Sequence, residues 1–151
     1  MIVTYIDSSA FLRLIMNQGN VSAVEHALGA NPTSSTLAGL EIRAAIFKQW
    51  HDGQILEEER DTLLAVSEQR ILANLALLDL SPETLSEAGN VVERHSLRTL
   101  DALHVATAIR ANRYLRRRGA RLDFVSADRR QSEAAREIFG TGTVTFVPPS
   151  H

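Results

Sequence analysis

Short apolar runs rich in β-branched residues alternate with longer segments of helical spacing along this chain, and no other feature constrains its fold as strongly. The first run, Ile-Val-Thr-Tyr-Ile, covers residues 2–6. The later runs expected as strands cover residues 33–36, 77–80, 122–125 and 143–147. Because strands that alternate with helices usually pair in parallel, the pattern predicts an α/β fold: a three-layer sandwich whose central, mostly parallel sheet is flanked by helices.

The intervening segments carry apolar residues at helical spacing and are bounded by helix start and stop signals. Ser81 followed by Pro82 marks a helix start, and Gly119 marks a stop. The expected helices cover residues 9–16, 21–28, 37–50, 55–76, 82–95, 99–118 and 129–139. The segment 55–76 is the longest of these and contains many charged residues.

Composition limits the classes of function that remain. With 151 residues and 44% hydrophobic content, we expect one domain spanning residues 1–151. A net charge of -2 argues against a chain built to coat nucleic acid, and the absence of cysteine excludes disulfides, thiolate metal sites and a cysteine nucleophile. Without a signal peptide or an apolar run near the ~20 residues that span a bilayer, we expect a soluble, cytoplasmic protein with no membrane partner.

Two aspartates stand where predicted strands end and helices begin. Asp7 follows the first strand, and Asp128 comes just after the strand at residues 122–125. The carboxyl ends of parallel strands share one edge of a sheet, where α/β proteins bind ligands. Aspartate is also a favoured helix N-cap, so the sequence leaves both a capping role and a functional role open.

Two further acids lie on helix faces that are otherwise nearly apolar. Glu41 shares its face with alanines and leucine, and Asp101 shares its face with His104. A carboxylate without water needs a cation, a hydrogen-bond network or a metal. Lys48 could pair with Glu41, and His104 with Asp101, so a purely structural explanation stays open for both.

If all four acids converge on one pocket, their like charges require a cation among them. Carboxylate oxygens are the ligands that hard divalent ions prefer, which favours Mg²⁺, with Mn²⁺ as the alternative. A metal held in this way can polarise a phosphodiester and activate water. The sequence therefore gives a hypothesis of metal-dependent phosphodiester hydrolysis.

Four segments in order resemble the PIN-domain nucleases, and among them the VapC-type toxins of type II toxin-antitoxin systems. They are YIDSSA at residues 5–10, STLAGLEIRAA at 35–45, LRTLDALHVATA at 97–108 and FVSADRR at 124–130. The resemblance covers nearly the whole chain. It implies a parallel sheet flanked by helices and a metal-dependent endoribonuclease that forms a homodimer, cleaves RNA and is neutralised by a small cognate antitoxin.

The resemblance also assigns roles to individual residues. It implies that Asp7, Glu41, Asp101 and Asp128 are the catalytic acids, and that Ser126 and Ser9 place hydroxyls beside the metal. In the resulting mechanism Asp7 and Asp101 are direct ligands of Mg²⁺ or Mn²⁺. Glu41 and Asp128 then bind through water, hold a second metal or orient the nucleophile.

Arginines near these motifs are candidates for phosphate contacts: Arg13, Arg43, Arg129 and Arg130. Each could equally belong to a solvated helix face. His104 is either an additional ligand on the Asp101 face or a hydrogen-bonded core histidine.

Three other functions compete with the RNA nuclease. A non-catalytic interaction module would use the acids as caps and as a docking groove for a basic peptide. A metal-dependent DNA nuclease would use the same acids on a different sugar. An aspartyl-phosphate phosphotransferase would need a second acid at Ser9, and the serine there argues against it.

Overall fold

The strands of this protein form one parallel sheet. The computed structural model describes residues 1–16 and 21–149. Within them the strand order is β3-β2-β1-β4-β5, and every neighbouring pair is parallel. The strands are β1 (Ile2–Ile6), β2 (Pro32–Ser35), β3 (Ala76–Leu78), β4 (Arg121–Ser126) and β5 (Val144–Phe146). The predicted parallel α/β sheet is therefore confirmed.

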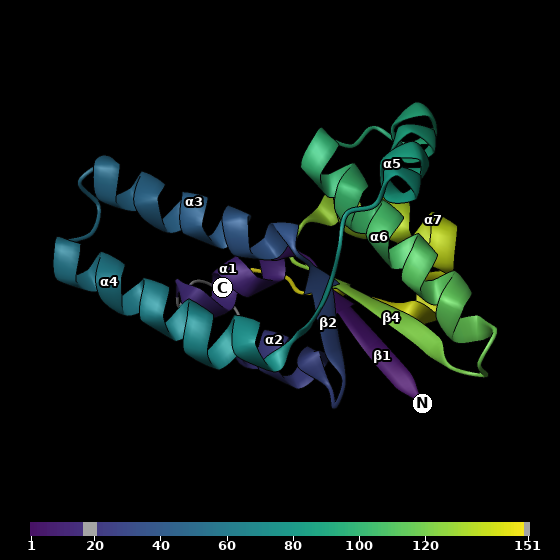
Figure 1. Cartoon of the computed structure of the whole chain (residues 1–151), viewed down its shortest axis with the longest axis horizontal. Coiled ribbons are helices and arrows are strands. Elements are labelled where there is room, and N and C mark those ends of the chain that lie inside the picture. The colour runs from purple at the N-terminus through teal and green to yellow at the C-terminus, as the bar shows by residue number, and fades with distance from the viewer. Residues whose placement is uncertain (17–20, 150–151) are drawn as a thin grey trace.

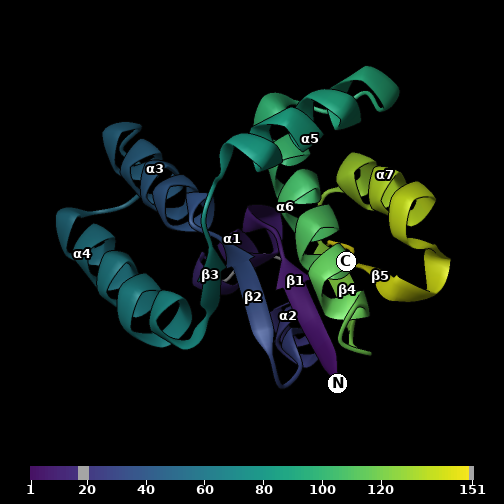
Figure 2. The ribbon, with the colours of Figure 1, turned by 45° about the vertical axis from the view of Figure 1, so that its right-hand side comes forward.

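Helices cover both faces of the sheet, as Figures 1 and 2 show. They are α1 (Ser8–Ile15), α2 (Val21–Leu28), α3 (Leu37–His51), α4 (Glu57–Val66), α5 (Pro82–Arg94), α6 (Thr99–Arg116) and α7 (Arg129–Phe139). In both views α3 and α4 form a pair that extends away from the sheet. None of the described helices combines the length and apolar character needed to cross a membrane.

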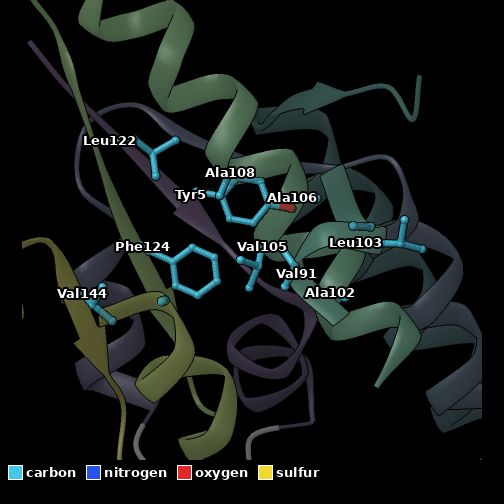
Figure 3. Close-up of a cluster of buried hydrophobic side chains, with 12 residues drawn as sticks. Tyr5, Val91, Ala102, Leu103, Val105, Ala106, Ala108, Leu122, Phe124 and Val144 are labelled. Atoms are coloured by element: carbon cyan, nitrogen blue, oxygen red, sulfur yellow. The ribbon is translucent and has the colours of Figure 1, made fainter. Parts of the chain in front are cut away.

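Alternating side chains of the strands fill two separate cores. Tyr5 and Phe124 point to one face, where they pack with residues of α5, α6 and α7 (Figure 3). Ile6 and Val125, the next residue on each strand, point to the other face and pack against α1, α2 and α3. This period of two is the expected geometry of a strand buried on both sides. The result is the predicted three-layer sandwich.

The predicted helix over residues 55–76 is wrong in its second half. α4 ends at Val66, a π-helical turn (Ser67–Ile71) and a 3₁₀ turn (Leu72–Asn74) follow, and β3 begins at Ala76. The Ser67 hydroxyl donates to the Leu63 carbonyl at 2.6 Å, which competes with regular helical hydrogen bonds. From Ala76 onward the backbone instead pairs with β2. The strand expected at residues 77–80 is confirmed with its start shifted to Ala76, so the error lies in where the preceding helix ends.

The order of the strands places a crevice above the centre of the sheet. From β1 the chain builds β2 and β3 on one side, whereas β4 and β5 lie on the other side. In open α/β sheets, ligands bind outside the carboxyl ends of the strands at such a reversal. Here β1 ends just before Asp7, and β4 ends at Ser126, two residues before Asp128.

Candidate functional site: an acidic groove at the carboxyl ends of β1 and β4

Asp7 is the most deeply buried acid of the four, with 1% of its surface exposed. It is the N-cap of α1, since its Oδ1 accepts a hydrogen bond from the Ala10 amide at 3.1 Å. The Ser9 hydroxyl donates to the same oxygen at 2.6 Å. The Ser126 hydroxyl donates to Oδ2. A carboxylate offers about four lone-pair sites, so these three donors leave room for one more partner.

Ser126 connects Asp7 to Asp128. Its Oγ accepts from the Asp128 amide at 3.0 Å while its hydroxyl donates to Asp7. Ser9 closes the other side, because its Oγ lies 3.3 Å from the Ser126 Oγ and accepts from the Ala127 amide at 2.9 Å. Asp128 itself caps α7 through the Gln131 amide at 2.9 Å. Both aspartates therefore act as caps, and their carboxylates still face the same edge of the sheet.

Glu41 has a different partner from the one considered from sequence. Lys48 pairs with Asp52 at 2.7 Å, whereas Glu41 Oε1 lies 2.5 Å from His104 Nε2. His104 therefore pairs with Glu41 and not with Asp101. The His104 ring is buried, and both its nitrogens have protein partners, so it is a core histidine that reaches the site through Glu41.

Asp101 lies between the other acids. It lines a cavity of about 330 Å³ together with Asp128, and an adjoining one of about 460 Å³ together with Glu41. Arg98 lines both cavities, and its Nε lies 3.3 Å from Asp101 Oδ2. A second guanidinium nitrogen of Arg98 is 4.0 Å from Asp128 Oδ2. We call these adjoining cavities the acidic groove; Asp7 is buried and lines neither of them, but Ser126 links it to Asp128.

The electrostatics of the groove favour an additional cation. Burial raises the pKa of Asp7, although nearby His104 and hydrogen bonds from serine hydroxyls oppose it. Burial also raises the pKa of Asp101, and the charge of Asp128 adds to this effect while Arg98 opposes it. Burial acts in the same direction on Glu41, but its interaction with His104 outweighs it and the pKa is lowered. Asp7 and Asp101 therefore lack full compensation from the protein.

The donor atoms of the groove fit a hard divalent ion. All four acids supply carboxylate oxygens, and a cation would relieve the unfavourable ionisation of Asp7 and Asp101. In the described residues, no three acidic or histidine side chains are already arranged around a common ion position. The acids would therefore have to close around a metal, with Arg98 moving away from Asp101.

The four candidate arginines divide into two groups. Arg129 and Arg130 are exposed and line the cavity that holds Asp101 and Asp128. Arg13 instead donates to the backbone carbonyls of Val147, at 2.7 Å, and Pro148. Arg43 of α3 pairs with Glu68, in the π-helical turn after α4, at 2.8 Å. Their contacts give Arg13 and Arg43 structural roles that the sequence does not reveal.

Sequence reasoning missed three residues of this site: Arg98, Ser8 and Tyr5. Arg98 stands three residues before Asp101, a spacing that could have suggested an ion pair at the start of α6. Tyr5 of β1 and Ser8 of α1 stand on either side of Asp7 in the sequence, and both contact His104. No local pattern identifies these two contacts, because they depend on how α6 crosses the sheet.

Comparison with known proteins agrees with this geometry. Similar solved structures include VapBC2 from Rickettsia felis bound to a promoter DNA fragment (TM-score 0.62, 13% identity, covering 99% of this chain and 98% of that one). A toxin-antitoxin complex from Klebsiella pneumoniae gives a TM-score of 0.58 at 17% identity, covering 94% and 95%. PAE2754 from Pyrobaculum aerophilum gives 0.53 at 19%, covering 89% and 87%. At these identities the likeness establishes the fold.

A search of curated protein sequences finds no match. The sequence profile of the PIN domain, by contrast, matches residues 4–137, a span that contains all four acids, Ser126 and Arg98. This match covers most of the chain, and the structure adds a parallel sheet with the acids at its carboxyl edge. The chain belongs to the PIN domain family.

Proposed function

We propose that this protein is a metal-dependent endoribonuclease that hydrolyses RNA phosphodiester bonds with Mg²⁺ or Mn²⁺. One observation carries the proposal most directly. Asp101 lines one cavity with Asp128 and an adjoining one with Glu41, so three acids from separate helices face the same groove, where Arg98 contacts Asp101 and Asp128. Burial raises the pKa of Asp101 although Arg98 opposes it, which is consistent with a site that binds a further cation.

The proposed roles follow from the contacts of each residue. Asp7 and Asp101 would hold the ion, which supplies Lewis acidity and a more acidic bound water when present. The Ser126 and Ser9 hydroxyls fix the Asp7 carboxylate. Glu41 and Asp128 would orient the attacking water, and Arg98, Arg129 and Arg130 at the groove would contact the RNA phosphates.

We further propose that the protein is the toxin of a type II toxin-antitoxin pair acting on cytoplasmic RNA. The Klebsiella pneumoniae structure, described as a toxin-antitoxin complex, and VapBC2 from Rickettsia felis support this role through their shared fold. The proposed partners are a cognate small antitoxin and a second copy of this chain, the latter on the basis of the sequence resemblance.

A non-catalytic docking module is the second candidate, and Arg98 favours it. A guanidinium already lies against Asp101 and Asp128. A basic peptide of a partner could place its own arginine in the same groove without any metal. This function requires no saturable binding of Mn²⁺, so titration calorimetry with Mn²⁺ separates it from the nuclease.

The nuclease proposal predicts that Asp101→Asn and Asp7→Asn remove RNA cleavage without unfolding the protein. Asparagine is also a good N-cap, so Asp7→Asn keeps the acceptor for the Ala10 amide. We expect the rate of cleavage of an RNA oligonucleotide in Mg²⁺ to fall by at least about 100-fold, corresponding to ~2.7 kcal/mol of transition-state stabilisation. Asp52→Asn, an identical change of charge at the far end of α3, should leave the rate unchanged.

Cleavage that persists in excess EDTA, or in both groove variants, would contradict a metal-dependent mechanism. A matched DNA oligonucleotide in the same assay tests the sugar preference. Faster cleavage of DNA than of RNA would replace the ribonuclease by the metal-dependent DNA nuclease.

A further inference from the structure

His104 lies directly behind Glu41, where three other elements meet. Its side chain is 1% exposed. Nδ1 lies 2.8 Å from the Tyr5 hydroxyl of β1, and Nε2 lies 2.5 Å from Glu41 Oε1 of α3. The Ser8 hydroxyl, at the start of α1, is 2.7 Å from the same Nε2. The ring therefore links the acid at the groove to the centre of the sheet.

The partners of His104 determine which nitrogen carries the proton. A carboxylate only accepts hydrogen bonds, so the 2.5 Å contact between Glu41 Oε1 and Nε2 requires a proton on Nε2. A tyrosine hydroxyl carries its proton at neutral pH, and that of Tyr5 lies 2.8 Å from Nδ1. That hydroxyl can then donate to Nδ1. Tyr5 thus selects the tautomer in which Nε2 donates to Glu41.

The core holds Tyr5 in place. Its ring stacks on Phe124, with centroids 5.6 Å apart and planes 8° apart, and meets the His104 ring edge-on at 6.0 Å. Figure 3 shows Tyr5 lying between Phe124 and the helix that carries Val105 and Ala106. Tyr5 is completely buried, so neither its ring nor the His104 ring can turn without displacing core side chains.

The Glu41 contact also fixes one acid relative to another. His104 and Asp101 lie three residues apart on α6, so they are neighbours on one side of that helix. By taking Oε1 of Glu41, His104 ties the carboxylate of α3 to the helix that presents Asp101. Because both ring nitrogens are occupied and the ring is buried, His104 is not placed to bind an ion or substrate itself.

We propose that His104 is a positioning residue of the acidic groove: its Nε2 proton holds the Glu41 carboxylate at a fixed place and orientation beside Asp101, and the Tyr5 hydroxyl fixes the tautomer that makes this possible. The inference rests on the proposed nuclease function and adds two residues to it that never touch RNA. Partners of this kind, behind the groups that bind a metal or activate water, typically change activity or metal affinity by 10- to 100-fold when they are replaced.

Two substitutions at His104 separate positioning from simple packing. His104→Leu replaces the ring by an apolar side chain of similar bulk and removes the donor. In His104→Gln, the side-chain amide can donate from nearly the position of Nε2. We expect His104→Leu to lower kcat for RNA by about 10- to 100-fold with little change in KM. His104→Gln should recover most of this loss at the same folded fraction, measured by circular dichroism. Equal impairment of the two variants would overturn the positioning role.

Nitrogen NMR of the metal-free protein tests the geometry without any assay of activity. In ¹⁵N-histidine-labelled wild-type protein, we expect His104 in the form protonated at Nε2 and unprotonated at Nδ1. Glu41→Gln should shift the Nε2 resonance, and Tyr5→Phe should populate the second tautomer because the donor to Nδ1 is gone. An unprotonated Nε2 in wild-type protein, or no response to Glu41→Gln, would overturn the inference.

The two experiments distinguish failure of this inference from failure of the proposed function. If wild-type protein cleaves no RNA while the NMR pattern is as expected, the nuclease proposal fails and the Tyr5, His104 and Glu41 chain stands as the device that orients Glu41. If RNA is cleaved but His104→Gln gives no recovery, the nuclease proposal stands and the positioning role fails.

Discussion

Arg98 brings a positive charge against two of the acids that are proposed to surround a metal. Its side chain is 82% exposed, and it contacts Asp101 more closely than Asp128. A divalent ion between these acids would compete with the guanidinium for the same oxygens. Once released, the guanidinium would remain at the mouth of the groove, where an RNA phosphate would be its natural partner.

This competition predicts effects of opposite sign for Arg98→Gln. Removing the guanidinium should tighten Mn²⁺ binding by about two- to fivefold, the range expected for the loss of an exposed ion pair. It should weaken RNA binding and reduce the dependence of log K on log salt by about 0.7, one phosphate contact. Calorimetry with Mn²⁺ and a salt titration of RNA binding measure the two effects.

Arg113→Gln is a matched control, because Arg113 pairs with Glu87 of α5 and lines neither cavity of the groove. It should leave Mn²⁺ affinity unchanged. If Arg98→Gln also leaves Mn²⁺ affinity unchanged, Arg98 does not compete with the metal, and its contact with Asp101 is only an ordinary surface ion pair.

Helix ends, at the scale of elements, determine where the acids lie. α1 and α7 begin after the N-caps Asp7 and Asp128; Asp128 also lines the groove, and Asp7 is linked to Asp128 through Ser126. α6 ends differently: Gly119 has φ of +72°, a left-handed conformation that closes the turn before β4. A side chain at this position is strained even though no atom would lie near its Cβ.

Two glycine substitutions test this account of the α6 end. Gly119→Ala should destabilise the protein by about 1 kcal/mol, because alanine disfavours the left-handed conformation. Gly89→Ala, in the interior of α5 with equally open space at its Cβ, should stabilise by up to ~1 kcal/mol. Urea denaturation gives both free energies of unfolding. Stabilisation by Gly119→Ala would show that the positive φ does not control the end of α6.

For the whole molecule, placing buried acids in and beside one groove should cost stability when no metal is bound. The folded-state pKa of Asp101 is raised above its unfolded value of about 3.9. The folded protein therefore takes up a proton before the unfolded chain does, and the destabilisation by Asp101 disappears as pH falls through the raised pKa. Asp7 acts in the same direction, whereas Glu41, with a lowered pKa, acts in the opposite direction at lower pH.

The pH dependence is tested by comparing wild type with Asp101→Asn in EDTA. At pH 7 the variant should have the higher melting temperature, since it lacks the unfavourable charge. This advantage should shrink as the pH is lowered from 7 towards 4, because wild-type Asp101 becomes protonated in the folded state. An advantage for the variant that is constant or grows on acidification would contradict the raised pKa.

The sequence by itself determined the alternation of strands and helices, the caps at Asp7, Asp128 and Ser81, and the presence of four acids at sheet ends and helix faces. These features depend on local spacing and turn chemistry, which neighbouring residues specify. Tertiary structure alone decided that Glu41 pairs with His104 and that Arg13 and Arg43 contact other partners. Those outcomes join residues far apart in sequence, so they depend on how the helices pack against the sheet and against one another.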